Sequence, residues 1–134
     1  YDCKVILTGG GSKNEKLYGK RLTENCNIIN LIGKTSLKQL CAIIDKADLV
    51  ICPDSGPAHI ATAFNTCVIG LYASSNPART GPYNSRKLTV NCYPEAVRKY
   101  LSKSIKWGER VRSPKVMELI KVEMVTDKIN QFFI

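Results

Sequence analysis

The chain has 134 residues, of which 44% are hydrophobic and 23% charged, a composition typical of one soluble globular domain with a single core. Its 20 lysine and arginine residues against 11 acidic residues give a formal net charge of +9, which favours phosphorylated substrates or an anionic membrane surface as partners. The sequence predicts no secretory leader and no membrane span of about 18 apolar residues, and it lacks the aromatic-rich basic stripe that single-stranded nucleic acid requires.

The chain begins with an apolar strand followed by a capped helix. Residues 4–8 predict a strand that stops at Gly9-Gly10-Gly11. Ser12 and Glu15 have the spacing of a capping box, which predicts a helix to about residue 24. The glycine run matches neither the G-x-G-x-x-G dinucleotide fingerprint nor a P-loop, so we interpret it as a turn.

A second strand and helix repeat this pattern. Residues 28–32 predict the strand, which Gly33 closes. Ser36 and Gln39 again have the spacing of a capping box. Apolar residues then fall on one face of a helix that extends to about residue 47.

The third strand leads into the most informative turn of the chain. Residues 49–52 predict a buried strand, Asp54-Ser55-Gly56 a turn, and residues 57–64 a helix with Pro57 at its first position. The only histidine of the sequence, His59, falls in the first helical turn. Unpaired N–H groups and partial positive charge at a helix N-terminus favour phosphate or carboxylate. Since ligands bind at the carboxyl ends of parallel strands, the turn predicts a site for an anionic small molecule such as a nucleotide derivative.

The pattern is less regular after the fourth strand, which we predict over residues 68–72. A polar loop over residues 73–86 is long enough to be functional, and residues 88–90 predict a last strand. Helices are predicted over residues 94–101, 114–120 and 126–133, the last of them capped by Thr126 or Asp127. The basic stretch 102–113 carries no assignable pattern.

Apolar strands that are each followed by a helix indicate a parallel sheet covered on both faces. With right-handed crossovers, this pattern predicts a doubly wound α/β domain.

The cysteines raise the alternatives of a disulfide framework and a metal site. There are six: Cys3, Cys26, Cys41, Cys52, Cys67 and Cys92. No two of them have CxxC spacing, and one histidine is too few to complete a zinc site. Most lie in or beside apolar runs, where a free cysteine behaves as a small hydrophobic residue; these are Cys3, Cys41, Cys52 and Cys67. We therefore expect reduced, buried thiols and no metal.

Several segments, taken together, resemble the bacterial lipopolysaccharide heptosyltransferases (glycosyltransferase family nine). Asp54-Ser55-Gly56-Pro57-Ala58-His59-Ile60-Ala61 resembles their D-[ST]-G-x-x-H segment. The other matching segments are Thr8-Gly9-Gly10 with Glu15, Thr35-Ser36-Leu37, and Val68-Ile69-Gly70-Leu71-Tyr72 followed by Asn76-Pro77. They cover residues 4–84 in the family's order and spacing, and residues 117–125 match more loosely. The resemblance implies a Rossmann-like fold, the C-terminal half of a two-domain GT-B glycosyltransferase.

The resemblance also implies a nucleotide-sugar donor site. Glu15 would bind the ribose hydroxyls, while Thr35, Ser36 and Leu37 would lie along the adenine, and the glycine turn would line the pocket. A purely structural role stays open for these residues, because each set also has the sequence of a capped helix start.

In the second matching turn, the resemblance implies that Asp54 binds hydroxyls of the transferred sugar. Ser55 and Gly56 would donate N–H groups to the diphosphate, and His59 would face the same phosphate. The structural alternatives are that Asp54 and Ser55 only cap the helix and that His59 is a structural histidine.

The implied function is the inverting transfer of heptose from ADP-heptose to the phosphorylated inner core of lipopolysaccharide. Residues 1–134 would be the donor-binding domain. The general base would lie in the absent N-terminal acceptor domain, so we expect no catalytic residue, no cofactor and no metal here. Because the chain begins at Tyr1 rather than at a methionine, we expect a piece of a longer protein. Without the general base, this piece should bind the donor but not turn it over. The implied location is the cytoplasm, at or near the inner-membrane surface.

Two alternatives remain open at this point. One is a glycosyltransferase of the same fold that uses another nucleotide sugar, for example a uridine derivative. The other is a non-catalytic α/β ligand-binding domain, since the fold alone does not imply catalysis.

Overall fold

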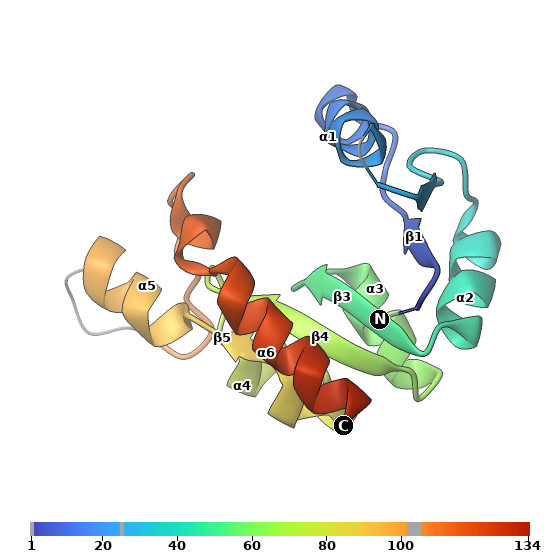
Figure 1. Cartoon of the computed structure of the whole chain (residues 1–134). Helices are drawn as coiled ribbons and strands as arrows, with labels where there is room; N and C mark the ends of the chain where they lie inside the picture. Colours follow the sequence, from blue (N-terminus) through green and yellow to red (C-terminus); the bar gives the residue numbers. More distant parts are fainter. Residues whose placement is uncertain (1, 25, 102–105) are drawn as a thin grey trace. The chain divides into compact units, whose positions relative to one another are not determined.

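The computed structural model describes residues 2–24, 26–101 and 106–134 (Figure 1). The chain divides into two compact units, an N-terminal unit over Tyr1–Ile43 and a C-terminal unit over Ile44–Ile134. The described strands pair only in parallel, in one sheet in each unit, and helices connect them. The predicted α/β class and parallel, Rossmann-like pairing are therefore confirmed.

The N-terminal unit is built on two short parallel strands. β1 (Val5–Leu7) pairs with β2 (Ile28–Asn30), and α1 (Lys13–Thr23) connects them. Gly19 is buried on α1, and a Cβ there would lie 2.7 Å from Cδ1 of Ile32. The glycine therefore lets the helix pack closely against the residues that follow β2. α2 (Leu37–Lys46) begins in this unit and ends in the next.

The C-terminal unit contains a parallel sheet with the strand order β3-β4-β5. The strands are β3 (Leu49–Pro53), β4 (Cys67–Tyr72) and β5 (Val90–Asn91). α3 (Gly56–Ala63) connects β3 to β4 and contacts both, while α6 (Val122–Phe133) contacts β4 and β5. In Figure 1, α3 lies behind this sheet and α6 crosses in front of it, so helices cover both faces, as expected.

Short helical segments fill the remainder of the C-terminal unit. They are α4 (Pro77–Thr80), the 3-10 segment η1 (Tyr83–Leu88), α5 (Tyr93–Tyr100) and the 3-10 segment η2 (Val116–Leu119). The polar stretch predicted as a loop over residues 73–86 thus contains two short helical segments, α4 and the start of η1. Asn76 caps α4 by accepting a hydrogen bond from the N–H of Ala78, a local signal that the loop prediction passed over.

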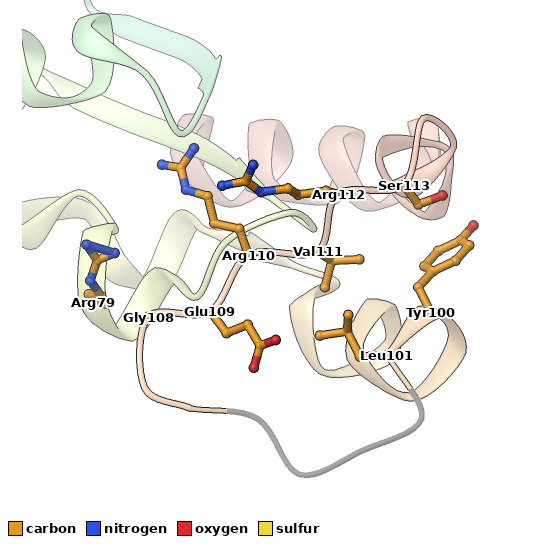
Figure 2. Close-up of a pocket in the computed structure, with 9 residues that line it drawn as sticks. All are labelled: Arg79, Tyr100, Leu101, Gly108, Glu109, Arg110, Val111, Arg112 and Ser113. Carbon is orange, nitrogen blue, oxygen red and sulfur yellow. The ribbon is translucent and has the colours of Figure 1, made fainter.

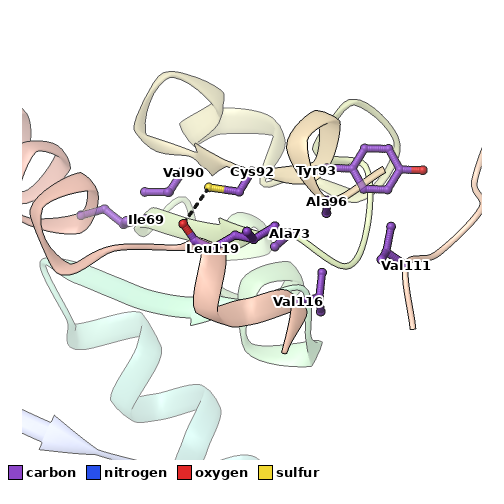
Figure 3. Close-up of a cluster of buried hydrophobic side chains, with 9 residues drawn as sticks. All are labelled: Ile69, Ala73, Val90, Cys92, Tyr93, Ala96, Val111, Val116 and Leu119. Carbon is purple, nitrogen blue, oxygen red and sulfur yellow. Dashed lines mark hydrogen bonds between the residues drawn. The ribbon is translucent and has the colours of Figure 1, made fainter. Parts of the chain in front are cut away.

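Apolar side chains from β4, β5, α5 and the segments that follow form the core of the C-terminal unit (Figure 3). Its buried members are Ile69, Ala73, Val90, Cys92, Tyr93, Ala96, Val111, Val116 and Leu119. Val111 belongs to the basic stretch that the sequence left unassigned. Residues 102–105 of that stretch lie outside the described residues, and residues 106–113 form neither helix nor strand.

A tightly packed contact on β4 adjoins this core. Tyr72 is fully buried, and its hydroxyl donates a hydrogen bond to the Thr80 carbonyl at 3.0 Å. A Cβ at Gly70 would lie 2.5 Å from the Tyr72 ring. Glycine at this position therefore leaves space for the Tyr72 ring, whose hydroxyl links β4 to α4 through its hydrogen bond to Thr80.

Several predicted boundaries were wrong. The strand predicted over residues 88–90 is β5 at Val90–Asn91, because Leu88 ends the 3-10 segment η1. The closing helix begins at Val122 rather than at residue 126, and its N-cap residue, Lys121, makes no side-chain cap. Thr126 lies inside the helix, where its hydroxyl donates to the Val122 carbonyl at 3.0 Å, so it is not a cap. The helix predicted over residues 114–120 is only the 3-10 segment η2, and Pro57 is the second residue of α3 rather than the first.

The cysteine prediction is confirmed in part. Cys52 is buried, but Cys3 precedes β1 and is exposed. Cys92, which the apolar runs did not single out, is buried in the core and contacts the Leu119 carbonyl through its sulfur at 3.7 Å (Figure 3).

Candidate functional site

The turn between β3 and α3 presents the open N-terminus of a helix. Ser55 occupies the N-cap position in an extended conformation (φ −153°), but its side chain makes no capping hydrogen bond. Its hydroxyl instead donates to the Pro53 carbonyl at 3.1 Å. The alternative that Ser55 is there only to cap the helix is therefore wrong. In the first turn of α3, Pro57 has no N–H and the Ala58 N–H donates to the Ser55 carbonyl at 3.1 Å. The N–H of Gly56 is therefore the group in this turn that can bind an anionic ligand.

Gly56 leaves space beside this turn. A Cβ added at Gly56 would have no atom within 4 Å, and Gly33 and Gly108 are the only described glycines with positive φ. Gly56 therefore does not adopt the left-handed conformation that favours glycine. Its small size instead keeps the approach to the backbone open.

Asp54 is held by residues that are distant in the sequence. Its side chain is only 11% exposed, and its Oδ2 accepts hydrogen bonds from Thr80 Oγ1 at 3.1 Å and from Arg110 Nη2 at 3.0 Å. Neither partner is a backbone N–H of α3, so Asp54 is not a helix cap either. The structure thus joins the predicted turn to α4 and to the basic stretch.

Sequence reasoning missed Thr80 and Arg110. Arg110 lies in the basic stretch that was noted but not assigned, and Thr80 lies in the segment interpreted as a loop. Only their basic or polar character could have drawn attention to them, because they are 56 and 26 residues away from Asp54 in the sequence.

His59 lies one helical turn from Asp54. Its Nε2 is 4.0 Å from Asp54 Oδ1, and 61% of its side chain is exposed. The structure therefore brings His59 to the predicted turn but does not bury it as a structural histidine would be buried. An exposed imidazole at this position can approach a ligand at the start of α3.

Two ionisable side chains near this turn, Tyr72 and Cys52, stay neutral near pH 7. Burial, followed by the nearby Asp54 carboxylate, raises the pKa of the Tyr72 hydroxyl to about 12. Burial also raises the pKa of the Cys52 thiol to about 11, although a hydrogen bond with Ser55 partly opposes the shift. Neither side chain therefore adds negative charge next to Asp54.

In the N-terminal unit, Glu15 closes the glycine turn. Its Oε1 accepts the Gly10 N–H at 2.8 Å, and its Oε2 accepts hydrogen bonds from the hydroxyl and the N–H of Ser12. Mainly the Ser12 hydroxyl, and then the Gly10 N–H, lower the pKa of Glu15 below its ordinary value. The structural alternative, a capping box, is thus present. A carboxylate has about four lone-pair sites, so Glu15 retains capacity for a ligand hydroxyl.

The turns that follow β1 and β2 lie side by side. Gly33 adopts a positive φ of 68°, where a Cβ would lie 3.1 Å from the Gly11 Cα, and its N–H donates to the Gly9 carbonyl at 3.0 Å. Both turns are at the carboxyl edge of the parallel pair, where ligands of α/β sheets bind.

The adenine-site candidates directly follow these turns. Ser36 and Gln39 form the expected capping box, because the Ser36 N–H donates to Gln39 Oε1 at 2.8 Å and Ser36 Oγ accepts the Gln39 N–H at 3.3 Å. Thr35 is half-buried, while the Leu37 side chain is exposed and available to a planar ring.

Asp54, Thr80 and Arg110 form what we call the Asp54 cluster. An open pocket of about 740 Å³ in the C-terminal unit adjoins this cluster at Arg110 (Figure 2). It is lined by Arg79, Tyr100, Leu101, Gly108, Glu109, Arg110, Val111, Arg112 and Ser113. Figure 2 shows the Arg110 and Arg112 side chains on one side of their segment and Val111 and Glu109 on the other. Arg110 and Arg112 thus extend from the same side of this segment, and of the two it is Arg110 that bonds to Asp54.

Among the described residues there is neither a candidate metal site nor a candidate membrane-spanning helix. No cluster of three or more histidine, cysteine, aspartate or glutamate side chains in these residues has the arrangement of a metal site. None of the helices in the described part of the chain is long and apolar enough to cross a membrane.

Comparison with known proteins identifies the family of this chain. Residues 1–106 match glycosyltransferase family 9 (heptosyltransferase). The lipopolysaccharide core heptosyltransferase OpsX of Haemophilus influenzae is 40% identical over 98% of this chain and 39% of its own length. Lipopolysaccharide heptosyltransferase 3 of Escherichia coli K12 is 32% identical over 74% of this chain and 33% of its own length.

A solved structure gives the same result. The crystal structure of a family 9 glycosyl transferase from Veillonella parvula superposes with a TM-score of 0.67 and 25% identity, over 96% of this chain and 36% of that chain. The chain therefore spans well under half the length of the relatives that it matches. The family match covers most of the sequence, and the chain belongs to glycosyltransferase family 9, the heptosyltransferase family.

Proposed function

We propose that this chain is the nucleotide-sugar donor-binding domain of a glycosyltransferase that transfers heptose from ADP-heptose, with inversion, to the phosphorylated inner core of lipopolysaccharide. The observation that carries the proposal is the β3–α3 turn, where an uncapped helix start adjoins an anchored carboxylate. A similar protein named as a lipopolysaccharide core heptosyltransferase supports the choice of sugar and acceptor.

The turn suits the leaving group of such a transfer. When the bond to the anomeric carbon breaks, the departing nucleoside diphosphate gains negative charge. In our proposal the N–H groups of Ser55 and Gly56, together with the dipole of α3, stabilise that charge, and His59 faces the same phosphate. Asp54 accepts hydrogen bonds from hydroxyls of the sugar.

The nucleoside contacts are proposed from the segments that match the family. Glu15 accepts hydrogen bonds from the ribose hydroxyls, and Thr35, Ser36 and Leu37 lie along the adenine. Support comes from the position of these residues at the carboxyl edge of β1 and β2 and from the matching segments of the family.

The acceptor side of the reaction is proposed to lie outside this chain. A separate N-terminal domain would supply the general base, so that no residue of the present chain removes the proton from the acceptor hydroxyl. The formal charge of +9 suits a phosphorylated acceptor at the cytoplasmic, anionic surface of the inner membrane.

Isothermal titration calorimetry of the chain with ADP, UDP and GDP tests the proposal. We expect ADP to bind most tightly, and we expect Asp54→Ala to leave ADP binding largely intact while it weakens the binding of ADP-heptose. A preference for UDP or GDP would retain nucleotide-sugar binding but contradict the heptose donor. Absence of binding by all three would contradict a donor site that this chain forms alone.

A further inference from the structure

The basic stretch that the sequence could not place contributes a side chain to the Asp54 cluster. Residues 106–113 form neither helix nor strand, yet backbone contacts fix their central part. The Val111 N–H donates to the Ser74 carbonyl at 2.8 Å, and Ser74 Oγ donates to the Val111 carbonyl at 2.9 Å. The Tyr93 hydroxyl donates to the Glu109 carbonyl at 2.7 Å. Arg110 therefore projects from a backbone that is anchored on both sides.

The two oxygens of Asp54 have different surroundings. Oδ2 accepts both hydrogen bonds, from Thr80 and from Arg110. Among the described residues Oδ1 accepts no hydrogen bond, and His59 Nε2 lies 4.0 Å from it. Among the described residues, Thr89 Oγ1 is the one fully buried side-chain oxygen or nitrogen without a hydrogen-bond partner. Since Asp54 Oδ1 also accepts no hydrogen bond there, it is not fully buried and can be reached from the surface.

From this asymmetry we propose that Arg110 and Thr80 are positioning residues that hold Asp54 by Oδ2 and present Oδ1 to a hydroxyl of the sugar donor. The inference rests on the proposed function and deepens it. A carboxylate that is 11% exposed requires a compensating cation, and Arg110, which is itself about half exposed, supplies one without blocking the outer oxygen.

This arrangement separates two contributions to donor affinity. The diphosphate binds at Ser55 and Gly56, whereas the sugar depends on the orientation of Asp54, and Asp54 is the residue to which Arg110 bonds. Loss of Arg110 should therefore weaken binding of the sugar moiety and spare the nucleotide. Arg112 projects from the same segment and has no partner among the described residues, so it provides a matched control for loss of charge.

The test is isothermal titration calorimetry of the chain with ADP and with ADP-heptose, comparing Arg110→Ala, Arg110→Lys and Arg112→Ala with the wild type. We expect Arg110→Ala to reduce the ratio of ADP-heptose to ADP affinity about tenfold, with ADP affinity unchanged within about twofold. Arg110→Lys should restore part of the ratio, and Arg112→Ala should match the wild type. In an Asp54→Ala background, Arg110→Ala should have no further effect on the ratio.

The outcomes distinguish the inference from the proposed function. A wild-type ratio in Arg110→Ala, or an equal loss of both affinities, would overturn the inference alone. If the wild type binds ADP-heptose no better than ADP, the inference fails while nucleotide binding stands. If the wild type binds neither ligand, the proposed function fails and the inference with it. Should Arg110→Ala not fold, Arg110→Lys serves as the test instead, because it keeps the charge but loses the Nη2 donor that bonds Asp54 Oδ2 at 3.0 Å, and so should still lower the ratio.

Discussion

At the scale of single residues, two glycines near the candidate site have opposite structural importance. A Cβ at Gly70 would lie 2.5 Å from the buried Tyr72 ring, whereas a Cβ at Gly56 would meet no atom within 4 Å. Both positions carry glycine in the segments that match the family, so sequence alone assigns them equal weight. The structure instead gives one a packing role and leaves the other free for ligand approach.

This difference predicts opposite outcomes for the same substitution. We expect Gly70→Ala to lower the free energy of unfolding by about 1–3 kcal/mol, because the ring of Tyr72 cannot shift without disturbing its packing. We expect Gly56→Ala to change it by less than about 0.5 kcal/mol but to weaken ADP binding. Urea unfolding of both variants checks the prediction. Equal destabilisation by the two substitutions would contradict the packing that we describe.

Glu15 gives a prediction about pH. Because its folded-state pKa lies below the ordinary value of 4.5, its carboxylate contributes stability that is present above pH 4.5 and is lost as the pH falls through the folded pKa. Since the Ser12 hydroxyl is the main cause, we expect Ser12→Ala to raise the pKa of Glu15. Carboxyl 13C NMR titrations of the wild type and the variant measure this. An unchanged pKa of Glu15 in Ser12→Ala would contradict the Ser12 hydroxyl as the main cause of the lowered pKa.

At the scale of elements, the sequence predicted best where a local signal marked each boundary. The capping boxes of Ser12–Glu15 and Ser36–Gln39 predicted the starts of α1 and α2 correctly, because a cap involves residues only three positions apart. The same type of signal failed at Thr126. Packing of α6 against β4 and β5 extends the helix towards its N-terminus without any side-chain cap.

The position of Thr126 within α6 can be tested by whether one substitution raises or lowers the stability of the protein. Inside a helix and exposed, threonine is a weaker helix former than alanine, so we expect Thr126→Ala to stabilise the protein by about 0.5 kcal/mol. At an N-cap the same change would destabilise it by about 1 kcal/mol. Thermal unfolding followed by circular dichroism distinguishes the two. A clear decrease in stability would contradict the start of α6 at Val122.

At the scale of the whole molecule, the sequence predicted the α/β class and the central turn, but not the partners of that turn. The segment Asp54-Ser55-Gly56 is contiguous and lies between a strand and a helix, so local pattern sufficed to find it. Thr80 and Arg110 reach Asp54 only through tertiary packing, across 26 and 56 residues of sequence. A single sequence carries no signal for such pairs. The basic stretch could therefore be recognised as basic but not placed.

The central claim is that the β3–α3 turn binds the diphosphate of a nucleotide sugar. Two-dimensional amide NMR of the chain during titration with ADP tests it most directly, because it reports on each N–H group separately. We predict saturable shifts at Ser55 and Gly56, with smaller shifts for amides of α6 that lie away from this turn. If ADP saturates the chain and the amides of Ser55 and Gly56 do not move, the diphosphate binds elsewhere and the account is wrong.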